Sequence, residues 1–434
     1  MVGKQKLMRP INNDDREGWQ AYWDAFGEKY RIRASDGIEY VWRTEPEIDG
    51  ERQAYLNSCR AIKPDFENGI YPFRAVKLDR ADVEWLLATH ESGDFIGPVV
   101  WSNPTHRSRE GLDLRGADLQ RSDLRGLPLA RLRAGLSYSE RGRTPPQMRE
   151  YAAVHLERAD VSAAYLEHAN LSWAHCEEAI LRETHLAEAD LFRARLDGAT
   201  LTEAHLDKAD LRFAYFDTET YLRGVVLTTI GTGPCLLAGL HWGEADLSLV
   251  NWSQLSELGD ERLARHPQDS EGKPYTGAIQ VEHYQAAVRA YRKLATVLRN
   301  QGLNEDADRF AYKAQKLQRQ VLRRQHRYGA AFGSWLLDLV AGYGYKPMRT
   351  LAVYLLALIS FSVAYFILGQ TVGPHLSPLG AFVFSMTSFH GRGFFPGGIV
   401  LDDPITVVAA FEAFVGLVVE VSFIATFTQR FFAR

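Results

Sequence analysis

The stretch "ADLFRARLDGATLTEAHLDKADL" (Ala189–Leu211) repeats its pattern every five residues. A leucine stands at every fifth position, and an alanine stands two residues before each leucine. A period of five matches neither the 3.6-residue period of a helix nor the two-residue period of a strand. The pattern is typical of a solenoid whose coil has four sides, with one repeat on each side and both residues directed to the axis.

The same register continues on both sides of this stretch. Steps of five from Leu156 to Phe216 never meet a charged residue, and small residues from Val154 to Ala214 precede these positions by two. Such a run predicts a continuous apolar axis. The axial positions are Leu156, Val161, Leu166, Leu171, Cys176, Leu181, Leu186, Leu191, Leu196, Leu201, Leu206, Leu211 and Phe216.

The motif A-[DN]-L-x-x recurs along the chain, as in Ala117–Leu119, Ala169–Leu171 and Ala209–Leu211. On these residues the chain resembles the pentapeptide-repeat family, which implies a right-handed quadrilateral β-helix. We expect the interruption Arg141–Met148 to form a loop that bulges from the solenoid. The resemblance covers residues 111–136 and 152–227, and less regularly Leu237, Trp242, Leu247 and Trp252.

The charge of the repeat surface bears on its partners. Some members of the family imitate DNA with an acidic surface, but residues 111–216 hold 17 Asp and Glu against 14 Lys and Arg. We therefore expect no nucleic-acid mimicry and no nucleic-acid partner, and we predict an unknown cytosolic ligand or protein at the solenoid. Pairs of histidines 20 residues apart, His155/His175 and His185/His205, should stack on neighbouring coils. Solvated surface histidines are the favoured interpretation, with a metal or proton sensor as the alternative.

The residues that could carry chemistry form no recognisable catalytic or metal-binding motif. The chain has 434 residues, of which 24% are charged, and its cysteines (Cys59, Cys176 and Cys235) are scattered singly. This pattern indicates neither a disulfide framework nor a zinc site. No nucleophile–base set, phosphate loop or metal-ligand spacing is visible, so we predict no enzymatic activity, no cofactor and no metal. The N-terminus has no apolar stretch of the secretory type.

The hydrophobic period becomes helical after the solenoid. Stripes over 284–300 and 304–321, separated by Gly302, resemble a single tetratricopeptide-type hairpin. No acid stands from Gln315 to Tyr328, where the second helix ends in a basic cluster. Such a cluster can be a solvated face or a nucleic-acid patch. Because an apolar span follows, we expect it to face anionic lipid headgroups. The basic cluster comprises Lys313, Lys316, Arg319, Arg323, Arg324 and Arg327.

Two uncharged or nearly uncharged runs, 350–369 and 405–429, are long enough to cross a membrane. Basic residues precede the first run and follow the second, whereas Arg392 is the only Lys or Arg between Gln370 and Pro404. The positive-inside rule therefore places both termini in the cytoplasm. We predict a multi-pass protein of the cell inner (plasma) membrane.

A short apolar helix is expected between the spans, over 378–387, with Ser377 as cap and Pro378 at its first position. A half-length helix followed by glycine-rich backbone is tolerated in a membrane only beside protein or a water-filled cavity. We therefore predict that the following residues form a selectivity filter. The filter residues are Ser388, Phe389, His390, Gly391, Arg392 and Gly393.

Over residues 345–432 the chain resembles the two-transmembrane pore-loop channels of the tetrameric cation-channel superfamily. "FSMTSFHGRGFFPGG" (Phe384–Gly398) stands in the place of the family's pore helix and filter. The resemblance implies the pore-loop fold and a homotetramer, but it does not extend to the family's potassium selectivity. We expect conduction of monovalent cations such as potassium, because four pore-helix C-termini would direct partial negative charge towards the cavity. An inward-facing Arg392 would instead favour an anion-selective or non-selective channel, and a membrane-tethered scaffold without transport is the other alternative.

The second span carries the predicted pore and gating residues, which follow one helical face. Glu420 would face the pore and attract cations, and Gly416 would be the bend that opens the helix. Alternatively, Glu412 anchors the filter through hydrogen bonds, and Glu420 pairs with Arg392 or a hydroxyl. The face comprises Glu412, Gly416, Glu420, Phe423 and Phe427.

These patterns predict a multidomain protein that contacts membrane lipids and permeating ions. The expected parts are an N-terminal α-rich cap (1–110), the repeat β-helix (111–255), a linker with the helical hairpin (256–329), an interfacial helix (330–349) and the two-transmembrane pore domain (350–434).

Overall fold

The chain folds into two compact units, residues 1–307 and 308–434. The computed structural model describes residues 9–33, 37–266, 268, 273–371, 375–391 and 403–431. The first unit holds the helices α1 (Arg16–Asp24), α2 (Gly50–Arg60), α3 (Arg80–Ala88), α4 (Tyr138–Arg143), α5 (Gly259–Arg265) and α6 (Gly277–Asn300), with the paired strands β1 (Arg31–Arg33) and β2 (Glu39–Val41), and β3 (Glu91–Ser92) and β4 (Phe95–Ile96).

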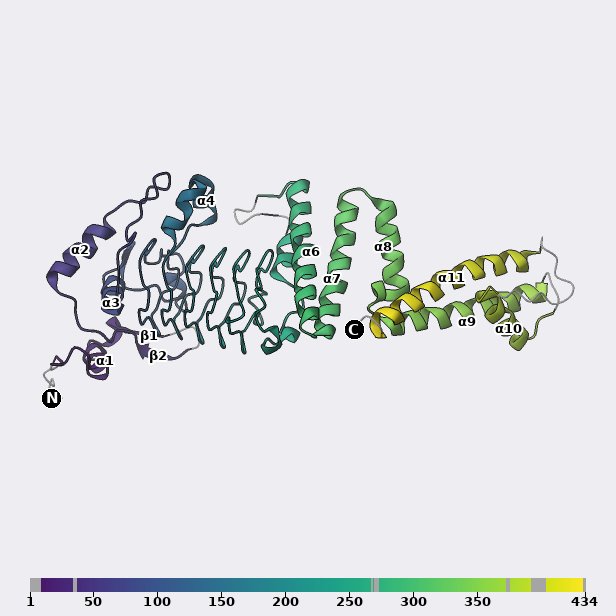
Figure 1. Cartoon of the computed structure of the whole chain (residues 1–434), viewed down its shortest axis with the longest axis horizontal. Helices are drawn as coiled ribbons and strands as arrows, with labels where there is room; N and C mark the ends of the chain where they lie inside the picture. The colour runs from purple at the N-terminus through teal and green to yellow at the C-terminus, as the bar shows by residue number, and fades with distance from the viewer. Residues whose placement is uncertain are drawn as a thin grey trace. The chain divides into compact units, whose positions relative to one another are not determined.

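The repeat forms the predicted β-helix, whose coils are stacked between α3 and α6 (Figure 1). Parallel bridges join residues 20 apart, such as His155 to His175 and Asp160 to Ile180, so one coil contains four repeats. All thirteen axial positions from Leu156 to Phe216 are buried, as are the small residues two places before them. Stacking of successive coils therefore builds one continuous apolar core.

The corners of the solenoid are tight turns with one residue in the left-handed region. Ala159 N donates to Leu156 O at 3.0 Å across such a turn, and Arg158 at its third position has φ 60°. This geometry is that of a type II turn. Glycine occupies the equivalent place at Gly198, with φ 69°, where a left-handed conformation costs it no strain.

The interruption of the repeat differs from the predicted loop. Residues 138–143 form α4, which begins with a capping box between Ser137 and Glu140, and a 3-10 helix follows over Pro146–Ala152. Arg141 pairs with Asp190 and lies 4.4 Å from the Phe192 ring centroid. The loop prediction was wrong because Ser-x-x-Glu is a helix-start signal and Arg141 ties the insertion to the coils.

Helices cover both ends of the solenoid core. Val83 of α3 lines a small apolar cavity together with axial residues such as Leu114, Leu119 and Leu156. At the other end, the Tyr291 hydroxyl on α6 donates to Glu261 at 2.5 Å and accepts from Leu258 N at 2.9 Å. These contacts close the apolar axis where a solenoid would otherwise expose it to water.

The helix α7 (Asn304–Arg324) follows Gly302, whose φ of 79° ends α6 as predicted. In the second unit come α8 (Tyr328–Ala341), a 3-10 turn (Gly342–Gly344), α9 (Pro347–Thr371), α10 (Pro378–Phe389) and α11 (Pro404–Phe431). The helix breaks between α8 and α9, where Gly342 and Tyr343 both have left-handed backbones.

Asp338 of α8 joins three helices of the second unit. It accepts hydrogen bonds from Tyr312 at 2.8 Å and Arg319 at 3.0 Å, both on α7, and pairs with Arg349 of α9 at 3.3 Å. Burial acts to raise the pKa of Asp338, but the hydrogen bonds from Tyr312 and Arg319 outweigh it and hold the pKa below its usual range. The carboxylate thus stays charged and holds α8 against α7 and α9.

Candidate functional site

The candidate site is the region where α10 packs against both long apolar helices. Among the described residues, α9 and the first part of α11 are each long and apolar enough to cross a membrane, and α10 is a shorter apolar helix. The Ser377 side chain caps α10 by accepting from Gly380 N at 3.0 Å, and Pro378 opens its first turn. The predicted short helix between the two long apolar helices is therefore confirmed.

Glu412 of α11 lies where α9, α10 and α11 meet, and its side chain is fully buried. Its carboxylate accepts from the Ser385 hydroxyl of α10 at 2.5 Å and from the Tyr365 hydroxyl of α9 at 2.6 Å. The rings of Tyr365 and Phe384 meet edge to face, with centroids 4.8 Å apart. Buried carboxyl groups require such partners, so Glu412 holds the three helices together. Apolar packing around it is supplied by Tyr365, Ala381, Phe384, Ile405 and Ala409.

The end of α10 rests on Gly416, one turn further along α11. A methyl group at this position would overlap the carbonyl oxygen of Phe389. The absence of a side chain is what lets the two backbones meet. Phe389 is itself buried with Val340, Leu358 and Val419.

A polar cluster follows at the next turn of α11. His390 Nδ1 bonds to a carboxylate oxygen of Glu420, and His390 Nε2 lies 3.3 Å from the Tyr354 hydroxyl of α9. The His390 and Glu420 side chains are 35% and 38% exposed, so the cluster is open on one side. Ionisable groups within an apolar span mark functional positions by default.

The other predicted site residues divide into three groups. Ser388 and Phe389 are buried at the end of α10, and Gly391 has a left-handed backbone with φ 67°. Phe423 and Phe427 are exposed, with ring centroids 6.0 Å apart. Arg392 and Gly393 lie outside the described residues. Within this chain, Glu412 and Gly416 thus face α10.

Sequence reasoning did not single out Tyr354, Tyr365 or Ser385. A tyrosine in an apolar run of sequence is as expected for a lipid-facing ring as for a buried hydrogen-bond donor. The two tyrosines therefore did not by themselves indicate a polar site. The signal that was available is Glu412, because an acid in such a span requires hydroxyl or basic partners nearby.

The histidine stacks predicted on the solenoid are confirmed. The rings of His155 and His175 lie 4.6 Å apart at an interplanar angle of 4°, and those of His185 and His205 lie 5.2 Å apart. Ligand atoms of His155, Glu157 and His175 lie within 4.8 Å of one another. The Nδ1 atom of His155 lies 2.9 Å from a Glu157 oxygen, and that of His175 lies 3.4 Å from a Glu177 oxygen. A hydrogen bond to Glu177 raises the pKa of His175.

Comparison with known proteins identifies the five-residue repeat as a known repeat type. The family described as pentapeptide repeats matches residues 169–207 and 189–228, with eight copies. The chain therefore carries pentapeptide repeats, and the match lies wholly within the solenoid. No curated protein matches the chain.

Solved structures that are similar to part of the chain include HetL, a pentapeptide-repeat protein involved in heterocyst differentiation regulation from the cyanobacterium Nostoc sp. strain PCC 7120. Identity is 25% over 30% of this chain and 54% of HetL, with a TM-score of 0.21. The chain thus spans about half the length of HetL. Rfr23 from the cyanobacterium Cyanothece 51142 is 29% identical over 29% of this chain and 87% of its own, with a TM-score of 0.11.

Proposed function

We propose that this chain is the subunit of a homotetrameric pore-loop channel that conducts monovalent cations such as potassium. The observation that carries the proposal is the packing of α10 between α9 and α11, with its end leading into residues 388–393. A simple two-helix anchor does not need a short third helix inside the membrane. A pore loop does need one, because irregular backbone at membrane depth must be supported by protein.

The buried Glu412 supports the same proposal. Placing a carboxyl group inside an apolar bundle is costly unless its hydrogen bonds are satisfied. Here those bonds run to Ser385 on α10 and Tyr365 on α9, so they fix the depth and tilt of the short helix. A filter requires its supporting helix to be held in this way, whereas a tether gains nothing from it.

Two features favour cations. The C-terminus of a helix carries partial negative charge, and four α10 helices would direct theirs toward a shared axis. Glu420 lies sixteen residues after Pro404, which corresponds to about 24 Å along α11, and its side chain is partly exposed. Four such carboxylates near the inner end of the pore would attract cations.

In this proposal both termini and the repeat solenoid lie in the cytoplasm, beneath an inner (plasma) membrane. The solenoid assembles or gates the tetramer through an unidentified cytosolic ligand or protein. Exposed apolar residues on α11 would contact lipids or neighbouring subunits; they include Phe411, Phe414, Leu417, Val421 and Ile424.

The test is planar-bilayer recording of the purified full-length protein in a KCl gradient. We expect a reversal potential on the cation side. A reversal on the anion side would contradict cation selectivity and would indicate that Arg392 faces the pore. A variant with residues 388–393 in scrambled order is the control, and we expect it to lose the currents. If the wild type carries no current and the scrambled variant keeps the wild-type activity in the host, the chain is a tethered scaffold.

A further inference from the structure

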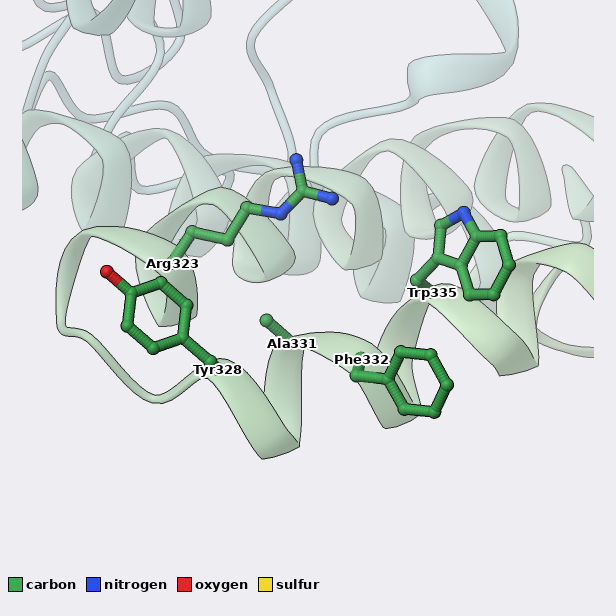
Figure 2. A pocket seen from close by; sticks show the side chains of 5 residues that line it. All are labelled: Arg323, Tyr328, Ala331, Phe332 and Trp335. Carbon is green, nitrogen blue, oxygen red and sulfur yellow. The ribbon is translucent and has the colours of Figure 1, made fainter.

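A pocket of about 390 Å³ opens where α7 ends and α8 begins. Figure 2 shows its lining, with Ala331 at the centre, Tyr328 on one side, Phe332 and Trp335 on the other, and the Arg323 side chain extending over them from α7. The volume falls in the range of small-molecule sites. The combination of one guanidinium with three aromatic rings indicates a ligand that has an anionic part and an apolar part.

Arg323 supplies the charge. Its side chain is exposed and makes no ion pair with any residue that the structure describes. The nearby Arg319, by contrast, forms an ion pair with Asp338, with Nη1 of the arginine 3.0 Å from Oδ2 of the aspartate. No acid stands between Gln315 and Tyr328, so the mouth of the pocket is positive. A guanidinium in this setting is well suited to a phosphate group, which it can bind through two parallel hydrogen bonds.

The three aromatic side chains form an apolar wall of the pocket, and this wall is exposed to solvent in the isolated chain. Tyr328 is 65% exposed, Phe332 63% and Trp335 42%, and the Phe332 and Trp335 rings stack with centroids 5.8 Å apart. Leu336, Leu337 and Leu339 extend this exposed surface along α8. The helix cannot rotate to bury it, because Asp338 is held by α7 and α9.

The pocket lies at the level where the first apolar span begins. Trp335 stands one turn before Asp338, and Asp338 accepts hydrogen bonds from Arg349 in the first turn of α9. Tryptophan and tyrosine concentrate at membrane–water interfaces, where the ring contacts acyl chains and the polar edge contacts headgroups. The depth of the pocket therefore corresponds to the headgroup layer.

We propose that this pocket binds one anionic phospholipid. Arg323 pairs with the phosphodiester, and the Tyr328 hydroxyl, which lies 3.0 Å from His326 Nδ1, faces the polar end of the headgroup. Phe332 and Trp335 pack against the glycerol and the first acyl carbons. The inference relies on the membrane insertion of α9 and α11 that the proposed function includes, but not on ion conduction. A free phosphate ion would leave the apolar wall without a partner, so the ligand is a lipid.

The experiment uses the full-length protein in phosphatidylcholine vesicles that contain brominated phosphatidylglycerol or brominated phosphatidylcholine, which quench tryptophan on contact. Subtracting the signal of Trp335→Phe isolates Trp335. We expect the phosphatidylglycerol to be preferred about fivefold, the effect of one basic residue at an anionic surface. Arg323→Gln should reduce this preference to about one, whereas Arg289→Gln, an equal charge change on the exposed side of α6, should leave it intact.

Equal quenching of Trp335 by both lipids in the wild type would overturn the proposal, as would a preference that survives Arg323→Gln. Loss of the preference on adding inorganic phosphate at constant ionic strength would identify a soluble anion as the ligand instead. Quenching by brominated phosphatidylcholine checks that Arg323→Gln is folded and inserted. If no tryptophan is quenched by either lipid, the membrane insertion of the proposed function fails as well.

Discussion

Ser385 on α10 donates a hydrogen bond of 2.5 Å to Glu412 on α11, and both side chains are fully buried. The same carboxylate accepts from Tyr365 on α9. One acid therefore connects all three apolar helices of the second unit. Its burial is tolerated because each oxygen has a hydroxyl donor.

Replacing Glu412 with leucine should destabilise the second unit. The Ser385 hydroxyl can still donate to the Leu358 carbonyl at 3.1 Å, but the Tyr365 hydroxyl loses its acceptor. Leaving a buried donor unsatisfied costs about 1–3 kcal/mol. We expect a lower thermal midpoint in detergent and faster amide exchange over α10, measured by mass spectrometry.

Glu412→Gln is the matched variant, since it keeps an acceptor oxygen at the same place. Its thermal midpoint should fall by less than that of Glu412→Leu. An unchanged midpoint for the leucine variant would show that the hydrogen bonds of Glu412 contribute nothing to the packing of α10.

Gly416→Ala should displace the end of α10, because the added methyl group would overlap the Phe389 carbonyl oxygen. Overpacking of this kind costs about 1–3 kcal/mol. Gly333→Ala on α8 is the control, since its added methyl would meet no neighbour within 4 Å and alanine favours a helix. In thermal unfolding in detergent, the midpoint of Gly416→Ala should lie below that of the wild type, and the midpoint of Gly333→Ala should lie above it. If Gly416→Ala were as stable as Gly333→Ala, the close approach of the two backbones would not matter.

Glu420→Gln should lower single-channel conductance or relieve block by polyvalent cations, because it removes four carboxylates from the proposed pore. The contact with His390 would persist as a neutral hydrogen bond, so folding should change little. The measurement is bilayer recording with and without a divalent cation. Currents and block identical to those of the wild type would place Glu420 outside the conduction path.

The pH dependence of the solenoid should report on Asp260. Burial raises the pKa of Asp260 to about 6 from 3.8, although its carboxylate accepts from Leu237 N at 2.7 Å and Ala238 N at 3.1 Å. The folded state therefore binds the proton more tightly than the unfolded state. The contribution of Asp260 to the free energy of unfolding should fall as pH rises from about 4 to 6, by an amount on the order of 3 kcal/mol.

Asp260→Asn should make the measured slope shallower, because asparagine does not titrate; part of the slope should remain, since burial also raises the pKa of Asp190 to about 6. Asp246→Asn, at an exposed cap on the same unit, should keep the wild-type slope. Urea denaturation of the full-length protein at several pH values, followed by circular dichroism, gives the comparison. Equal slopes for Asp260→Asn and the wild type would contradict the raised pKa. The slope is the readout, since asparagine also loses one of the two acceptor oxygens.

The sequence predicted the β-helix well because its period is a local property. Each Leu and Ala in the register, from Leu156 to Leu211, is buried by the coil above and below it regardless of the rest of the chain. The short helix between the spans was also predictable, since Ser377 and Pro378 are local start signals. The interruption at Arg141 was predicted, but its docking on the coils was not, because that contact depends on the ion pair with Asp190, 49 residues away.

By itself the sequence determined the five-residue solenoid, the apolar helices with the short helix between them, and the presence of costly acids in the second span. Only the tertiary structure decided which partners satisfy those acids: Ser385 and Tyr365 for Glu412, and His390 for Glu420. Helix period gives the face on which an acid lies, but not the rotation of that face toward a neighbouring helix. That rotation is set by packing contacts between residues far apart in the chain, such as Gly416 against Phe389.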